Sequence, residues 1–292
     1  MSTSTEIREQ VRTRQWMDRA FAWLCGGATL VSVSILVMLI GKIVIEGVAR
    51  VNWQLLTSFP SRFPEQAGVK SALVGSLWFI VLTAFISVGV GVGAAVYLEE
   101  YAPKTRIRGL IQTNIANLAG VPSIVYGILG LGLFVRAISL QQSLIAGALT
   151  LSLVILPIII MASQESLRAV PDSIRHASYA LGATRWQTIR HQVLPASIPG
   201  IMTGVILALS RALGEAAPLV MIGALNYVAF LPQGLRDPFT ALPIQIFNWT
   251  SRPQPEFHEL AAAAILVLLA MLLGMNAIAV FVRYRYAKHI RW

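Results

Sequence analysis

Five stretches of this chain lack charged residues over lengths that can cross a lipid bilayer. They cover residues 21–41, 71–98, 109–135, 137–164 and 260–282. A spanning helix needs about 20 predominantly apolar residues, so each stretch is long enough. A sixth span begins near Pro199 and contains two charges, Arg211 and Glu215. The sequence therefore predicts an all-α polytopic membrane protein with six transmembrane helices.

The composition excludes a soluble fold. Only 12% of the residues are charged and 56% are hydrophobic, whereas soluble domains carry about 25% charged residues. The net charge of +10 does not indicate nucleic-acid binding, because the basic residues flank the span ends instead of gathering on one face. We therefore expect membrane lipid, and no nucleic acid, around this chain.

The distribution of Lys and Arg predicts the orientation. Six spans place both termini on one side, and the segments of that side carry about twice as many Lys and Arg residues as those opposite. Cytoplasmic segments are the basic ones, so both termini should be cytoplasmic. The expected order is a cytoplasmic tail (1–20), a first span (21–41), an outer segment (42–70), a membrane core (71–283) and a second cytoplasmic tail (284–292).

Small residues and prolines add detail to this core. Gly89 and Gly93 in one span, and Gly200 and Gly204 in another, have a spacing that lets helix backbones approach closely. A second outer segment, about 226–259, is dense in proline, which breaks helices. We therefore predict glycine-mediated packing within the core and an irregular outer connection.

The chain lacks the residues of a membrane enzyme. Its histidines all lie outside the predicted spans, at His176, His191, His258 and His289. His258-Glu259 is followed by Ala262 where the metalloprotease pattern requires a second His. Neither a phosphate-binding loop nor a nucleophile elbow occurs. We expect no catalytic residue, no metal and no cofactor in this chain, and no ATP hydrolysis by it.

The polar segment between spans four and five, about 165–199, predicts two short helices. Residues 171–173 are helix-start signals, and Ile174, Ala177 and Leu181 then fall on one helical face. Gly182 permits a reversal of the backbone. A helix pair of this kind could lie in the lipid headgroup region, or it could insert into a groove on a partner protein.

The second of these helices has its own start and stop signals. Thr184 and Gln187 have the spacing of a capping box. Trp186, Ile189 and Val193 repeat the apolar spacing, and Leu194-Pro195 is expected to end the helix before the next span. The whole segment is predicted to face the cytoplasm.

This segment resembles the EAA loop of binding-protein-dependent ABC transporter permeases, whose pattern is Glu-Ala-Ala, three residues, Gly, nine residues, Ile, one residue, Leu-Pro. The chain matches it at Ala177, Gly182, Leu194 and Pro195, and departs from it at His176, Ser178 and Gln192. The resemblance implies the permease core of a type I ABC importer. It assigns ATPase coupling to six residues, His176, Ala177, Ser178, Gly182, Leu194 and Pro195.

Arg211 and Glu215 are the only charges within the predicted spans. A central Arg costs roughly 2.5 to 3.5 kcal/mol in a membrane helix, so it normally faces a bundle interior or an aqueous path. Glu215 follows at i+4 and can pair with it. The pair could simply order the bundle, or its guanidinium could bind an oxyanion in a bidentate way.

Polar residues in the third span are further candidates for such a pathway. Asn117, Ser123 and Tyr126 flank a possible kink at Pro122. Each alone is more often a helix-packing residue. Together with Arg211 and Glu215 they form the predicted substrate pathway.

The segments 114–127, 210–219 and 245–249 resemble those of PstA-type permeases, a family of phosphate ABC transporter subunits. The resemblance implies uptake of inorganic phosphate by alternating access across the bacterial cytoplasmic membrane. It also implies a second, PstC-type permease, two ATP-binding subunits that hold ATP and Mg²⁺, and a phosphate-binding protein. The alternatives are a permease for phosphonate, sulfate or molybdate, and a stand-alone anion channel or secondary transporter.

Overall fold

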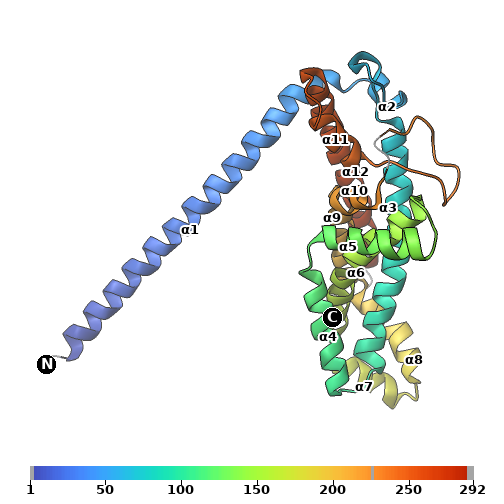
Figure 1. Cartoon of the computed structure of the whole chain (residues 1–292). Helices are drawn as coiled ribbons and strands as arrows, with labels where there is room; N and C mark the ends of the chain where they lie inside the picture. The colour runs from blue at the N-terminus through green and yellow to red at the C-terminus, as the bar shows by residue number, and fades with distance from the viewer. Residues whose placement is uncertain (1–2, 225–226, 288–292) are drawn as a thin grey trace.

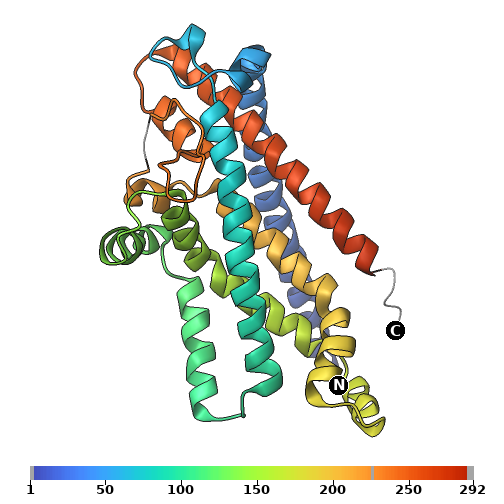
Figure 2. The same cartoon turned by 90° about the vertical axis from the view of Figure 1, so that its right-hand side faces the viewer.

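The computed structural model describes residues 3–224 and 227–287, which are almost entirely helical. Most of the long helices share one axis and form an elongated bundle (Figures 1 and 2). In chain order the elements are α1 (Thr3–Gly47), η1 (Val48–Arg50), α2 (Trp53–Thr57), η2 (Pro64–Gln66), α3 (Lys70–Val96), η3 (Tyr97–Tyr101), α4 (Arg106–Ala119), α5 (Ser123–Gly130), η4 (Leu131–Ala137), α6 (Leu144–Arg168), α7 (Asp172–Ala180), α8 (Arg185–Thr188), η5 (Ile189–Val193), α9 (Leu194–Gly214), α10 (Ala217–Ile222), α11 (Leu242–Thr250) and α12 (Pro255–Ala287). The elements η1 and η2 are 3₁₀ turns, and η3, η4 and η5 are π-helical.

Helix α6 is the centre of the bundle, with α3 and α9 packed against it (Figure 2). Its residues Leu151, Ile155 and Ile159 are completely buried and belong to the largest apolar cluster. Apolar side chains from α3 and α9, including Phe79 and Ala208, complete this cluster. Between membrane helices such burial stabilises the fold through close van der Waals packing, because lipid tails are as apolar as these side chains.

Glycine packing within the core differs partly from the prediction. Gly200 and Gly204 lie directly against Ser166 and Ala162 of α6, as expected. Gly89 and Gly93 are exposed, with no atom near a Cβ position, so the prediction for this pair was wrong. Gly91 is instead the close-packed glycine of α3. A Cβ there would meet the Ile159 side chain at 2.7 Å.

The predicted count of six spans holds only if one broken helix pair is counted as a span. Within the described residues, five helices are long and apolar enough to cross a membrane, and α4 with α5 and η4 forms a sixth, bent by 102°. The span predicted over 109–135 is therefore a broken helix pair, and the possible kink at Pro122 is a sharp bend. The helix ends at Gly120 because Pro122 has no amide hydrogen and favours an extended residue before it. The segment α5 then runs across the bundle (Figure 1).

The two long terminal helices extend the bundle. Helix α1 is far longer than the predicted span 21–41. The C-terminal end of α1 contacts α12, and toward its N-terminal start α1 diverges from α12 (Figure 1). At the contact, a Cβ on Gly47 would lie 2.7 Å from the Ala262 backbone. The start of α1 and the end of α12 both point toward the end of the bundle that holds α7, which we call the α7 end (Figure 1). Which side of the membrane this end faces stays a prediction.

The proline-rich outer segment is more ordered than predicted. It contains α11, whose first turn holds Pro243, a position where the missing amide hydrogen does no harm. The loop before α11 folds back on the bundle, where Phe239 stacks on Phe79 with ring centroids 5.5 Å apart. Carbonyls of Leu235 and Asp237 accept the first amide hydrogens of α6. This loop therefore caps a helix that begins inside the bundle.

A substitution at Gly91 tests the packing of α3 on α6. Gly91→Val should destabilise the protein by about 1 to 3 kcal/mol, because a larger side chain would overpack against Ile159. Gly93→Val is the matched control, since no neighbour lies near its Cβ position. Thermal unfolding of the full chain in detergent gives the comparison. Equal midpoints for the two variants would contradict this packing.

Candidate functional site

The predicted pair of short helices is present at the α7 end. Helices α7 and α8 are separated by Gly182, which adopts a left-handed backbone conformation with φ +83°. No atom lies within 4 Å of a Cβ built on Gly182, so the requirement for glycine is conformational and not steric. The amide hydrogens of Gly182 and Ala183 close the end of α7 by donating to the Tyr179 and Ser178 carbonyls.

The two helices are held together by side-chain hydrogen bonds. Thr184 and Gln187 form the predicted capping box, in which the Thr184 amide donates to Gln187 Oε1 at 2.8 Å and the Gln187 amide donates to Thr184 Oγ1 at 3.4 Å. The hydroxyls of Ser178 and Thr188 are 2.8 Å apart. Ser178 therefore joins α7 to α8, a role that alanine, the usual residue of the EAA pattern, could not have.

A groove between the helices gathers several of the predicted coupling residues. Its volume is about 680 Å³, and its lining consists of Ile174, Ala177, Ser178, Leu181, Gly182, Ala183, Gln187, His191 and Gln192. His176 is exposed on α7 outside this lining. At the rim, the side chain of Leu181 is 89% exposed. Leu181 directly follows α7, so this exposed side chain lies at the turn between the two helices.

The predicted end of the second helix at Leu194-Pro195 was wrong. The chain continues without a break from α8 through η5 into α9, so one helical rod covers Arg185–Gly214. Pro195 lies in the first turn of α9, directly after the π-helical turn η5. A π turn shifts the hydrogen-bond partners by one residue, which accommodates the amide hydrogen that proline lacks. Leu194 and Pro195 are therefore half-buried in a continuous rod.

Arg211 lies at the far end of this rod. Its Nε donates to Glu215 Oε1 at 3.3 Å, as the i+4 spacing predicted. The helix does not continue through the pair, however, because α9 ends at Gly214 and Glu215 has an extended backbone with ψ 110°. Pro218 favours this break. The Arg211 side chain is 47% exposed and that of Glu215 is 19% exposed, so the guanidinium has room for a second acceptor.

The bend between α4 and α5 lies near this pair. The Tyr126 hydroxyl donates to the Leu118 carbonyl at 2.8 Å, across the break. Tyr126 is buried in the same apolar cluster as Ala212 and Leu213, the neighbours of Arg211. Ser123 is half-buried in the first turn of α5. Tyr126 thus has a structural role at the bend, and its part in a pathway stays a prediction.

Asn117 is less closely associated with the pair. It is exposed on α4, and its carbonyl accepts the Gly120 amide hydrogen at the break. The crossing of α5 and α10 brings the bend toward Glu215, and a Cβ on Gly127 would lie 2.7 Å from Pro218 Cα. The structure therefore joins Ser123 and Tyr126 to the region of Arg211 more directly than Asn117.

Two polar connections of this region were missed from the sequence. Ser210, next to Arg211, donates to Asn276 of α12 at 2.8 Å, and Arg283 donates to Thr203 at 3.0 Å. Asn276 lies within an apolar span. A search for charged residues within the spans does not find it, because its amide side chain is uncharged. These bonds join α9 to α12 at two points about two helical turns apart.

The chain matches the family model of the binding-protein-dependent transport system inner membrane component over residues 86–291. It is 31% identical to the probable ABC transporter permease protein YqgI of Bacillus subtilis (strain 168), with 90% of this chain and 95% of that protein covered. It is 36% identical to the phosphate transport system permease protein PstA 1 of Mycobacterium tuberculosis (strain ATCC 25618 / H37Rv), with 76% and 72% covered.

A solved structure has the same fold. A bacterial ABC transporter involved in the import of the acidic polysaccharide alginate matches with a TM-score of 0.64 and 15% identity, covering 93% of this chain and 99% of that one. This likeness concerns the fold alone. The family match and the relatives go further, and the protein belongs to the binding-protein-dependent transport system inner membrane components.

Proposed function

We propose that this chain is the permease subunit of an ATP-driven importer of inorganic phosphate in the bacterial cytoplasmic membrane. One observation carries the proposal: a single helical rod, Arg185–Gly214, joins the groove between α7 and α8 to Arg211 of the predicted pathway. A stand-alone channel or secondary transporter has no use for such a groove. The likeness to a phosphate transport system permease supports phosphate as the substrate.

The chemistry of Arg211 suits an oxyanion. A guanidinium presents a planar fork that matches two oxygens of phosphate, and its charge does not depend on pH. Glu215 holds the fork when no substrate is present. At the C-terminal end of α9 the helix dipole favours a positive side chain. An arriving phosphate would either bind Arg211 together with Glu215 or displace Glu215 from Arg211.

Transport would proceed by alternating access. Two ATP-binding subunits, which hold ATP and Mg²⁺, would seat the exposed side of α7 in a cleft, and a second, PstC-type permease would complete the pathway. A phosphate-binding protein would deliver substrate at the opposite end. Closure of the ATP-binding subunits would move α7, and the rod of α8, η5 and α9 would carry that movement to Arg211.

Reconstitution of the complete transporter tests the substrate. The chain is combined in liposomes with its second permease, ATP-binding subunits and binding protein, and ATP-driven uptake is compared for phosphate, phosphonate, sulfate and molybdate. We expect phosphate to be taken up preferentially. Uptake without preference for phosphate would reject the substrate but leave the ABC permease role intact, and no ATP-driven uptake of any oxyanion would reject both.

Arg211→Ala should reduce phosphate uptake by more than about 100-fold while leaving assembly unchanged. The reason is the loss of two charge-assisted hydrogen bonds, each contributing about 1.5 to 3 kcal/mol. Arg211→Lys keeps the charge without the fork and should retain only a small part of the uptake. Radiolabelled phosphate uptake and co-purification of the subunits are measured together. Normal uptake by Arg211→Ala would exclude a role in the pathway.

Gly182→Val should uncouple ATP hydrolysis from uptake. A β-branched residue is a genuine outlier at the positive φ of this position, so the angle between α7 and α8 would change. Gly182→Asn is the matched control, because asparagine tolerates the left-handed conformation. Phosphate transported per ATP hydrolysed is compared for the two variants. An unchanged ratio in Gly182→Val would show that this turn is dispensable.

A further inference from the structure

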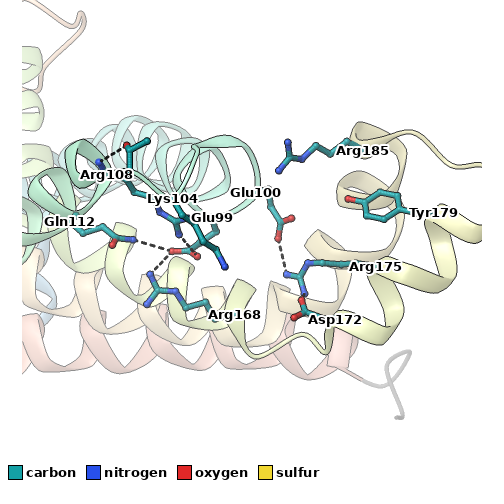
Figure 3. A pocket seen from close by; sticks show the side chains of 12 residues that line it. Glu99, Glu100, Lys104, Arg108, Gln112, Arg168, Asp172, Arg175, Tyr179 and Arg185 are labelled. Atoms are coloured by element: carbon teal, nitrogen blue, oxygen red, sulfur yellow. Dashed lines mark hydrogen bonds and ion pairs between the residues drawn. The ribbon is translucent and has the colours of Figure 1, made fainter.

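Two adjacent glutamates at the end of α3 lie almost buried in a charged pocket. Glu99 and Glu100 belong to the π turn η3, and their side chains are only 8% and 7% exposed. The pocket, of about 630 Å³, lies between η3, α4, α6 and α7 (Figure 3). Carboxylates are buried at this level only where cations compensate them. The position of the cations therefore decides what each glutamate does.

The two carboxylates reach different parts of the bundle. Glu99 accepts from Arg168 of α6 at 2.5 Å and from Arg108 of α4 at 2.9 Å. Glu100 accepts from Arg175 of α7 at 2.8 Å, as Figure 3 shows. Glu99 thus holds η3 to α4 and α6, whereas Glu100 holds η3 to α7.

Arg175 is held by the end of α6 as well as by Glu100. Its side chain is 14% exposed, and it also donates to the carbonyls of Leu167 and Val170 at 2.9 and 2.7 Å, at the end of α6. It precedes the predicted coupling residues 176–178 directly in the sequence. Any displacement of α7 must therefore move Arg175 and strain its bond to Glu100.

We propose that the ion pair of Arg175 with Glu100 is a second coupling link, through which α7 moves η3, α4 and the bend that carries Ser123 and Tyr126. The first link is the rod of α8, η5 and α9, which ends at Arg211. The first link ends at Arg211, and the second reaches the bend of α4 and α5, where Tyr126 shares an apolar cluster with Ala212 and Leu213. Arg175 and Glu100 are positioning residues, since they act through the helices and do not touch substrate. The inference rests on the proposed transport function.

The same arginine supplies a matched control. Arg175 also pairs with Asp172 at 3.2 Å, but that carboxylate lies on α7 itself and its side chain is 83% exposed. Glu100→Gln turns the ion pair between η3 and α7 into a weaker hydrogen bond to a neutral group, because the glutamine oxygen can still accept from Arg175. Asp172→Asn removes a negative charge from the same arginine without separating any two elements. A purely local electrostatic effect on Arg175 would appear in both variants, and a mechanical link only in the first.

The experiment uses the complete transporter in liposomes and measures phosphate uptake and ATP hydrolysis in the same vesicles. We expect Glu100→Gln to lower phosphate transported per ATP by about five-fold or more, while co-purification with the ATP-binding subunits persists. Asp172→Asn should keep the wild-type ratio. A wild-type ratio in Glu100→Gln, or an equal loss in both variants, would overturn the link.

Two further outcomes of this experiment also have a defined meaning. If Glu100→Gln does not co-purify with the ATP-binding subunits, Glu100→Asp replaces it, since aspartate keeps the charge on a shorter arm. A lowered ratio then supports the link and an unchanged ratio overturns it. If the wild-type transporter itself takes up no oxyanion, the proposed function fails, and that result is distinct from failure of the link alone.

Discussion

Backbone groups inside a bilayer must find their hydrogen-bond partners within the protein, because each unpaired group costs several kcal/mol. In this bundle, hydrogen bonds supply partners for backbone groups at the bend of α4 and α5 and at the start of α6. The Tyr126 hydroxyl donates to the Leu118 carbonyl across the bend of α4 and α5. The first amide hydrogens of α6 donate to Leu235 and Asp237 of the outer loop. The loop after α10 is therefore part of the core, and the irregular segments can lie beside Arg211 because of it.

The end of α9 follows the same logic for charge. Placing an Arg in mid-membrane costs roughly 2.5 to 3.5 kcal/mol, and a helix C-terminus returns only about 0.3 to 1 kcal/mol in an ordinary setting. The dipole alone is thus too weak. Glu215 pairs with Arg211 at the i+4 spacing and adds compensation that the dipole lacks. Under the proposed function, an anionic substrate would take over that compensation from Glu215.

Sequence patterns predicted the local features well and the three-dimensional ones less so. The capping box and the left-handed Gly182 depend on neighbouring residues only, so the α7 to α8 turn was predictable. The bend at 120–122 was not, because hydropathy is continuous across it and proline in a membrane helix often gives a mere kink. Gly89 and Gly93 have the right spacing, but spacing does not tell which helix face meets α6. Sequence patterns do not single out Glu99 and Glu100, because their partners on α6 and α7 are distant in sequence.

The buried glutamates also explain which contact sets the position of α7. Neighbouring side chains on a helix project in different directions, so Glu99 and Glu100 reach cations on different elements. An exposed pair such as Asp172 with Arg175 contributes about 0 to 1 kcal/mol, whereas removing one partner of a buried pair costs about 3 to 5 kcal/mol. Arg175 bonds both carboxylates through different nitrogens, and the buried pair with Glu100 is the one whose loss costs more. Since Glu99 holds η3 to α4 and α6 at the same time, ion pairs connect α7 through η3 to both of these helices.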